Sequence, residues 1–267
     1  MSDLKPARRR DSKPKAESGA EPGSEPRSKP RAKPRTKPAV PAKAVGRVLK
    51  ARTPKPVDRA TMVEIFRRLH AANPEPRGEL DYTNPYTLLV AVALSAQATD
   101  VGVNKATKAL FPVADTPQRM LDLGEEGLRE HIRTLNFFNT KAKNVIAAAR
   151  RLVEEFGGEV PNSVEILETL PGVGRKTASV VVNIAFGDPR VAVDTHIFRV
   201  TNRLPLAITR TPLETQEALE ALIPDEFRLH AHHWLILHGR YICKARRPEC
   251  WRCPVNDLCR YPDKTIP

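Results

Sequence analysis

The sequence predicts an all-α fold, and three observations support that prediction. From about residue 58 onward, apolar residues recur at intervals of three and four, which is the period of one helix face. The alternation of apolar and polar residues that is typical of strands is absent, apart from a short apolar run at residues 191–193. Proline and glycine pairs interrupt the pattern at intervals that suit helices joined by short connections.

The first two predicted helices lie between residues 58 and 97. Asn73-Pro74 ends the first helix, because the residue before a proline avoids helical geometry. Asn84-Pro85 opens the second, which is expected to reach Gln97, since proline suits the first turn of a helix. One face of the first helix is formed by the residues at i, i+3, i+4 and i+7: Met62, Ile65, Phe66 and Leu69.

The next stretch predicts further helices up to residue 158. Phe111-Pro112 and Thr116-Pro117 separate two of them. Residues 141–156 form another predicted helix, and Gly157-Gly158 closes it, because glycine accepts the left-handed backbone that follows a helix.

A helix pair with a tight connection follows. Asn162, with Glu165 three residues later, resembles a capping box and predicts a helix over residues 163–170. A turn at residues 171–174 and a second helix over residues 175–186 complete the pair.

Lys176 begins the second helix of this pair. A helix amino end carries about half a positive charge. An ammonium is therefore disfavoured there, which is expected to lower the pKa of the amine and favour its nucleophilic form. Gly172 and Gly174 carry no Cβ, so the amides of the turn can approach a phosphate closely. These features predict a lysine that attacks a group on a nucleic-acid backbone, although an ordinary helix connection with a solvated lysine remains the alternative.

The charge of the chain is unevenly distributed. Residues 1–57 contain 17 of the 44 Lys and Arg residues, 5 of the 31 Asp and Glu residues and 10 of the 25 prolines. This segment has no aromatic residue and cannot bury enough apolar surface to fold. We expect a disordered basic tail that acts either as an electrostatic DNA tether or as a solubilising extension.

No apolar run reaches the roughly 18–20 residues that span a bilayer. The basic tail also lacks the apolar stretch of a secretory signal. We therefore expect a soluble, cytoplasmic protein without a membrane partner, associated with the nucleoid if the source is bacterial.

All four cysteines lie within residues 243–259, with the spacing C-x6-C-x2-C-x5-C: Cys243, Cys250, Cys253 and Cys259. Two disulfides are disfavoured in a reducing cytosol. Four thiolates suit zinc or an iron–sulfur cluster, and the spacing alone does not choose between these metals. Four histidines at residues 230–238 lie among apolar residues and are expected to be packed and capping side chains rather than a second metal site.

Four strings of residues together resemble one known family. They are Leu-Pro-Gly-Val-Gly-Arg-Lys-Thr-Ala at 170–178, Val-Asp-Thr-His at 193–196, Leu-Ser-Ala-Gln-Ala-Thr-Asp at 94–100 and His-His-Trp-Leu-Ile-Leu-His-Gly-Arg at 232–240. These strings resemble the helix-hairpin-helix DNA glycosylases, and most closely the endonuclease III family. The resemblance covers about residues 58–267.

The resemblance implies that Lys176 is the catalytic nucleophile and that Asp194 is its essential partner. A carboxylate near C1′ stabilises the oxocarbenium character that develops as the base leaves. The neutral amine attacks C1′, and β-elimination from the resulting Schiff base cuts the strand 3′ to the lesion. An aspartate before Thr195 is also a common helix N-cap, and Asp194 can serve in both roles.

The resemblance also implies that two side chains fill the space left when the target base is extruded. Gln97 and Phe137 stand at these positions. The family commonly has glycine and leucine where this chain has Asn136 and Phe137, so the lesion preference is expected to differ. Core packing is the alternative for Phe137.

The cysteine spacing matches the [4Fe–4S] motif of the family, which identifies the expected cofactor. The cluster is expected to shape a basic loop between its first two ligands rather than to react. Further contacts with the DNA backbone are expected from the hairpin and from this loop, at Gly172, Gly174, Arg175, Lys244, Arg246 and Arg247.

The family implies two helical domains beside the tail. Residues 78–188 are expected to form a six-helix domain that carries the hairpin. Residues 58–77 and 189–267 are expected to form a second helical domain with the cluster loop. DNA would lie in the cleft between the two domains.

The predicted activity is that of a bifunctional DNA glycosylase and apurinic/apyrimidinic lyase. It would act as a monomer on duplex DNA that contains oxidised or ring-saturated pyrimidines or abasic sites. One alternative is a monofunctional adenine-mispair glycosylase, but such enzymes lack the lysine at position 176 and carry a further C-terminal domain. The other alternative is a non-catalytic iron–sulfur DNA-binding module, which leaves Lys176 and Asp194 without a role.

Overall fold

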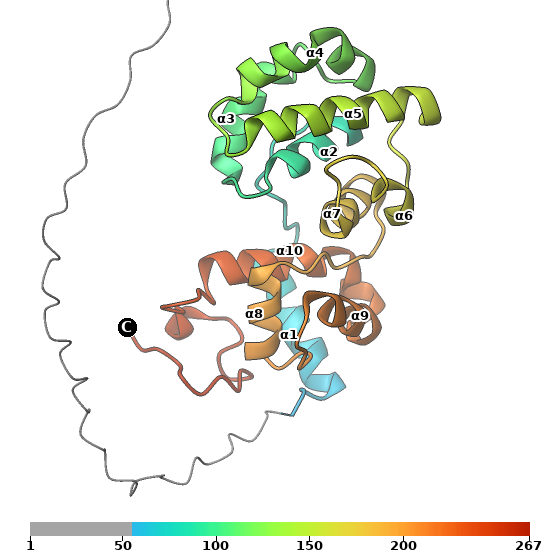
Figure 1. The fold of residues 1–267 in the computed structure, drawn as a ribbon. Helices are drawn as coiled ribbons and strands as arrows, with labels where there is room; N and C mark the ends of the chain where they lie inside the picture. The colour runs from blue at the N-terminus through green and yellow to red at the C-terminus, as the bar shows by residue number, and fades with distance from the viewer. Residues whose placement is uncertain (1–54) are drawn as a thin grey trace, which may run out of the picture. The chain divides into compact units, whose positions relative to one another are not determined.

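The structure, a computed structural model, describes residues 55–267, and the predicted tail lies outside the described residues except for residues 55–57. The described part contains ten α-helices, one 3-10 helix and no strand, which confirms the all-α prediction (Figure 1). The elements in chain order are α1 (Arg59–Ala72), α2 (Pro85–Leu94), α3 (Asp100–Leu110), α4 (Pro117–Ile132), α5 (Phe138–Phe156), α6 (Val164–Leu167), α7 (Arg175–Phe186), α8 (Thr195–Arg203), α9 (Pro212–Leu222), α10 (Asp225–Tyr241) and η1 (Cys250–Arg252).

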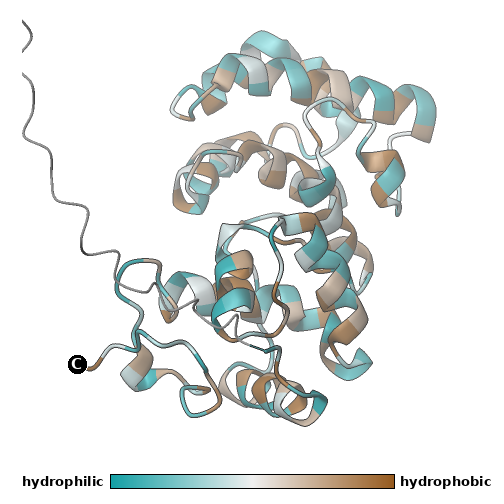
Figure 2. Cartoon of the chain, turned by 60° about the horizontal axis from the view of Figure 1, so that its bottom comes forward, coloured by the Kyte–Doolittle hydropathy of each residue, from teal (hydrophilic) through white to brown (hydrophobic). Residues whose placement is uncertain are grey.

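The helices bury two separate hydrophobic cores. Helices α2 to α7 enclose the first core, where α5 lies along α4 and α2 packs on α7. Helices α1, α8, α9 and α10 enclose the second, together with the C-terminal segment. Most helices carry both hydrophobic and hydrophilic residues, as expected for helices that bury one face (Figure 2). The predicted domain boundaries, at residues 78 and 188, remain a prediction.

Aromatic side chains form the centre of the second core. Phe66 of α1 is fully buried and stacks on Phe227 of α10, with ring centroids 5.9 Å apart. Trp234 lies against both rings, and its indole Nε1 donates a hydrogen bond of 2.8 Å to the carbonyl oxygen of Asn73. The aromatic group therefore ties the end of α1 to the middle of α10, two elements far apart in the chain.

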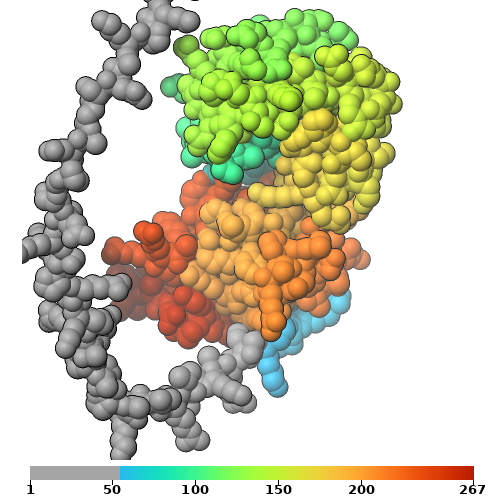
Figure 3. All heavy atoms as spheres, viewed as in Figure 1, coloured from blue at the N-terminus to red at the C-terminus, as the bar shows by residue number. Residues whose placement is uncertain are grey.

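The chain passes between the cores at residues 191–193. Val191 and Val193 are buried in the second core, whereas Ala192 is buried in the first. The apolar run that looked like a short strand is an extended connection that contributes to both cores. The two groups of helices meet along a seam in the space-filling view (Figure 3).

Polar contacts join the two groups of helices. Asn183 of α7 donates to the carbonyl oxygen of Leu229 in α10 at 3.1 Å. Arg240 of α10 forms ion pairs with Glu79 and with Asp100, the first residue of α3.

No helix within residues 55–267 is long and apolar enough to cross a membrane.

The start of α2 is fixed by a capping box. The Asn84 side chain accepts a hydrogen bond from the Thr87 amide at 2.8 Å, and the Thr87 hydroxyl accepts one from the Asn84 amide at 3.0 Å. The predicted extension of this helix to Gln97 is wrong, because α2 ends at Leu94 and Gln97 has a left-handed backbone with φ +54°.

Replacing Asn84 by alanine should lower the free energy of unfolding by about 1 kcal/mol, because the start of α2 loses its side-chain cap. Urea unfolding followed by far-ultraviolet circular dichroism measures this change. Both variants lose the bond that Asn84 Nδ2 donates to the carbonyl oxygen of Asp115 at 2.9 Å, but Asn84→Asp keeps a capping oxygen and should lose less than Asn84→Ala. Equal losses in the two variants would show that the cap is not the source of the stability.

Candidate active site

The hairpin lies between the two helices of the predicted pair. Helix α7 begins at Arg175 and ends at Phe186, as predicted, and Gly174 is its N-cap. Gly172 has φ +78°, and a Cβ there would lie 2.8 Å from Cβ of Asn144. Glycine is therefore required at position 172 both for its backbone conformation and for the close approach of α5.

The helix before the hairpin differs from the prediction. The capping box at Asn162 and Glu165 is wrong, because Ser163 is the N-cap and its hydroxyl accepts from the Ile166 amide at 3.2 Å. The helix is also shorter than predicted, since α6 ends at Leu167 and only turns continue to Leu170.

Helix α7 has no side-chain cap at its start. The first amides of a helix have no partner within the helix, so those of α7 are available to an external acceptor. Arg175 is exposed and forms an ion pair of 3.5 Å with Glu168. Lys176 follows on the first turn and is also exposed. This end of α7 offers amide donors and a primary amine side by side.

A cavity of about 240 Å³ opens beside Lys176, lined by residues of α2, α7 and α10 and of the adjoining loops. Its apolar walls include Leu88, Val180 and Ile236. Its polar lining includes Gln97, Asp100, Lys176, His232, His233 and Arg240. A second cavity, behind the hairpin at Lys141 and Gly172, measures only about 40 Å³.

Asp194 is the N-cap of α8, and its Oδ1 accepts a hydrogen bond from the Ile197 amide at 2.8 Å. The side chain is half-buried and does not line the cavity beside Lys176. His232 lines that cavity, and the backbone of Ala192, two residues before Asp194, acts to raise the pKa of its ring against the larger effect of burial. The structure thus shows that Asp194 caps helix α8.

Gln97 and Phe137 share a strained backbone. They are the only non-glycine residues with positive φ within residues 55–267, at +54° and +57°. The Asn136 side chain donates to the carbonyl oxygen of Gln97 at 3.1 Å, so the two loops are joined. Phe137 is 62% exposed, which excludes the core-packing alternative. Strained, exposed positions of this kind are typical of binding sites.

His232 and His233 are the site residues that sequence reasoning missed. Both are buried, and their rings meet edge to face with centroids 5.2 Å apart. Burial lowers the pKa of His232 to about 3, and the charges of His233 and Lys176 add to the effect. Burial lowers the pKa of His233 to about 4. Both rings are therefore neutral at pH 7.

The four cysteines are free thiols that line one small cavity together with Leu204, His238 and Tyr261. Burial, together with the charges of the other three thiols, raises the pKa of the Cys253 thiol to about 11. In the described part of the chain, no three His, Cys, Asp or Glu side chains converge closely enough to hold a single metal ion. Four thiols that line one cavity are a ligand set that suits an iron–sulfur cluster.

Hydrogen bonds support this arrangement of the cysteines. The Tyr261 amide donates to Sγ of Cys259 at 3.4 Å, and the Arg203 guanidinium lies 3.7 Å from Sγ of Cys243. Such donors stabilise thiolates that ligate a metal. Arg203 also stacks over the Tyr261 ring, 4.5 Å from its centroid.

The basic loop between Cys243 and Cys250 is partly neutralised. Lys244 forms an ion pair of 2.5 Å with Glu249, which also pairs with Arg252. Arg246 and Arg247 are exposed. Of the three cations that sequence analysis assigned to this loop, the two arginines are the ones presented without an ion pair in the described residues.

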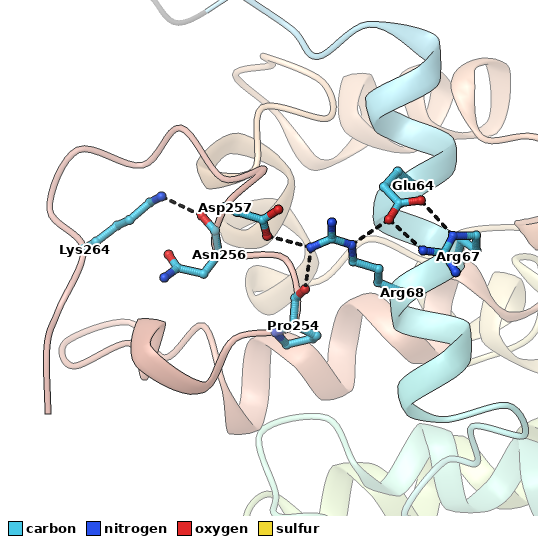
Figure 4. A network of polar contacts seen from close by, with 7 residues as sticks. All are labelled: Glu64, Arg67, Arg68, Pro254, Asn256, Asp257 and Lys264. Atoms are coloured by element: carbon cyan, nitrogen blue, oxygen red, sulfur yellow. Dashed lines mark hydrogen bonds and ion pairs between the residues drawn. The ribbon is translucent and has the colours of Figure 1, made fainter.

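Arg68 anchors the cysteine region to α1. Its guanidinium donates to Asp257 at 2.6 Å and to the carbonyl oxygen of Pro254 at 3.2 Å (Figure 4). Both acceptors lie in the segment between Cys253 and Cys259. Arg67 shares the carboxylate of Glu64 with Arg68 but makes no contact with that segment among the residues drawn.

Comparison with known proteins agrees with these features. The family described as HhH-GPD superfamily base excision DNA repair protein matches residues 90–225. The iron-sulfur binding domain of endonuclease III matches residues 243–259, a segment that begins with Cys243 and ends with Cys259. The hairpin lies within the first matched region, and the four cysteines lie within the second.

Curated relatives match most of the chain. Endonuclease III of Treponema pallidum is 58% identical over 195 residues, which are 73% of this chain and 92% of that protein. Endonuclease III of Haemophilus influenzae is 54% identical over 208 residues, 78% of this chain and 99% of that protein. A solved structure of endonuclease III trapped as a covalent intermediate with DNA covers 77% of this chain and 97% of its own, with 41% identity and a TM-score of 0.72. The chain therefore belongs to the endonuclease III family of base excision DNA repair enzymes, which are DNA glycosylases with apurinic/apyrimidinic lyase activity and carry a [4Fe–4S] cluster.

Proposed function

We propose that Lys176 is the nucleophile of this enzyme and that Asp194 assists it, on duplex DNA that contains oxidised or ring-saturated pyrimidines or abasic sites. The observation that carries the proposal is the position of Lys176, on the uncapped first turn of α7 beside a cavity of about 240 Å³. A related endonuclease III has been trapped as a covalent DNA intermediate, which supports an enzyme nucleophile.

The chemistry needs an amine, a carboxylate and a target base that has left the stacked duplex. The neutral amine of Lys176 attacks C1′ as the bond to the base breaks, and the base leaves with the bonding electrons. The carboxylate of Asp194 stabilises the positive character at the sugar. Loss of the ring oxygen bond at C1′ gives a Schiff base, and removal of a C2′ proton then expels the 3′ phosphate.

Two sets of groups would hold the DNA. The free amides at the start of α7 and the hairpin residues Gly172 and Gly174 would bind a backbone phosphate without reading sequence. Gln97 and Phe137 would enter the space that the extruded base leaves in the helix. Their strained backbones and the Asn136 bond between their loops support this role, since both side chains are presented from fixed positions.

The four cysteines would hold the [4Fe–4S] cluster, which, when bound, cross-links the C-terminal segment through metal–sulfur bonds. The protein's own contribution is to fix the ligand segment. Arg68 does this from α1, and Arg203 does it from α8 by donating to the carbonyl oxygens of Lys244 and Ala245. Arg246 and Arg247 are then presented toward solvent, where they would contact the phosphate backbone.

Lys176→Ala should abolish the covalent complex that borohydride traps on an abasic duplex, because no primary amine remains at C1′. Asp194→Asn should keep the cap of α8 and slow base release by roughly a hundredfold or more, since the transition-state charge is no longer balanced. Borohydride trapping on an abasic duplex measures the first effect, and single-turnover base release from a thymine-glycol duplex measures the second. A Lys176→Ala variant that still forms the trapped complex would rule out the assignment.

Phe137→Ala should lower the affinity for a damaged duplex by about tenfold, because the loss of base stacking costs about 1–3 kcal/mol per base. Phe137→Leu, which keeps an apolar side chain of intermediate size, should lie between the alanine variant and the parent. Equilibrium binding to a duplex with an uncleavable abasic analogue measures the order. An undamaged duplex serves as the control, and equal weakening there would argue against a wedge.

Arg68→Met should make the cluster more sensitive to an iron chelator, because the segment between Cys253 and Cys259 loses its anchor on α1. The bleaching rate of the visible absorbance of the holoenzyme measures this. Arg67→Met removes a neighbouring arginine that pairs with the same Glu64, and it should bleach at the parental rate. Equal rates in Arg68→Met and the parent would show that the anchor does not protect the cluster.

A further inference from the structure

Lys141 of α5 is a buried lysine that the proposed function does not use. The residue is 8% exposed, and its Nζ makes no hydrogen bond with any of the described residues. Lysine is almost never fully buried unless a partner neutralises its charge, because an unpaired charge taken out of water strongly destabilises the folded state. A lysine in such a place therefore suggests a negatively charged partner that binds the enzyme from outside.

Lys141 lies on the face of α5 that packs against the hairpin. It shares that face with Asn144, which is three residues further along the helix. A Cβ on Gly172 would lie 2.8 Å from Cβ of Asn144 and 3.0 Å from its Nδ2. Lys141 also lines the cavity of about 40 Å³ behind the hairpin, together with Pro171, Gly172 and Val173. Gly172 is itself exposed, so the hairpin contacts α5 on one side and solvent on the other.

No carboxylate lies among the residues that line this cavity. The only other lining side chains with polar atoms are those of Asn144 and Tyr86. Burial raises the pKa of the Tyr86 hydroxyl, which therefore stays uncharged at neutral pH. Burial lowers the pKa of the Lys141 amine, and a negative charge at the hairpin would oppose that shift and favour the ammonium form.

The hairpin is the place where such a charge would arrive. In the proposed function, a backbone phosphate of DNA binds there through the free first amides of α7. Opposite charges attract more strongly across a protein interior than across water, and salt screens a buried charge much less than an exposed one. A buried ammonium behind the hairpin can therefore attract the phosphate without touching it.

We propose that Lys141 is a positioning residue for DNA: its buried ammonium is the counter-charge of the phosphate that the hairpin holds, and it acts through the hairpin rather than by contact. This role deepens the proposed function, on which it rests. The unpaired charge destabilises the free enzyme, and a bound phosphate offsets that destabilisation. Arg246 and Arg247 differ from Lys141, because they are exposed and would attract the DNA backbone from solvent.

The first test separates a role in DNA binding from a role in folding. Lys141→Met removes the charge and keeps a long unbranched side chain. The urea midpoint of the DNA-free holoenzyme should stay or rise, since an apolar group replaces an unpaired buried charge. The affinity for a duplex with an uncleavable abasic analogue should nevertheless fall by on the order of tenfold. Unchanged affinity, or a loss of affinity together with a lower urea midpoint, would overturn the proposal.

Lys143→Met is the matched control. Lys143 lies two residues further along α5, on the opposite side of the helix, and it is exposed. The substitution changes the net charge of the chain by the same amount, but the charge it removes is screened by solvent and salt. This variant should therefore bind the same duplex within about twofold of the parent. An equal loss in the two variants would indicate general attraction of a polyanion and would rule out a special role for Lys141.

The second test removes the charge from the DNA. A methylphosphonate, which is neutral, replaces one phosphate at a time near the abasic analogue. The parent should lose affinity most at the phosphate that the hairpin holds. Lys141→Met should lose much less at that position and as much as the parent elsewhere, because one member of the charge pair is already missing. Losses that match the parent at every position would contradict the proposed pairing.

The methylphosphonate series also distinguishes a failure of Lys141 from a failure of the proposed function. If no single replacement weakens binding by the parent, the phosphate site at the hairpin fails, and the role of Lys141 fails with it. If one position matters equally to the parent and to Lys141→Met, only the role of Lys141 fails. The nucleophile is tested independently, by borohydride trapping with Lys176→Ala, so its failure would leave both of these results unchanged.

Discussion

The uncapped start of α7 is the constraint on which the candidate site depends. Gly174 contributes no side chain to the first amides, so their hydrogen bonds must come from outside the protein. The rest of the helix cannot move to relieve this, because Ala178, Val181 and Val182 are completely buried in the first core. A rigid helix with an open amino end is a fixed anion site, and it also fixes the position from which the Lys176 side chain extends. In the proposed function, binding of the DNA backbone and placement of the Lys176 amine would both follow from this one packing arrangement.

The helix boundaries around the hairpin were predictable from the sequence only where a single residue could cap the helix. Helix α7 was predicted from Arg175 to Phe186 because glycines at 174 and 187 bound it and nothing nearby offers another cap. The boundary before the hairpin was missed because Asn162 and Ser163 are both good N-caps, and only the structure shows that the Ser163 hydroxyl reaches the Ile166 amide. A short helix held between a cap and a turn has too few residues for periodicity to decide its length.

The lining of the cavity beside Lys176 was less predictable than the hairpin, for a physical reason. Lys176, Asp194 and the four cysteines stand in strings whose residue types are unusual, so sequence alone singles them out. His232 stands in α10, which is buried on most sides, and there a histidine looks like any packed residue. Its place in the wall of the cavity that Lys176 also lines comes from tertiary packing, which no local pattern encodes. The left-handed backbones of Gln97 and Phe137 are likewise imposed by tertiary structure, against the preference of both residue types.

Helix α8 connects the two chemical centres of the chain. Asp194 caps the first turn of α8. Arg203, the last residue of the helix, donates to two carbonyl oxygens of the loop after Cys243. Gly239 lets α10 approach so closely that a Cβ there would lie 2.8 Å from Cβ of His196. The helix is therefore held at both ends and along one side, and a rigid helix transmits displacement of one end to the other. The segment after Cys243 and the Asp194 cap are thus joined through the backbone of one helix, even though the two sites share no side chain.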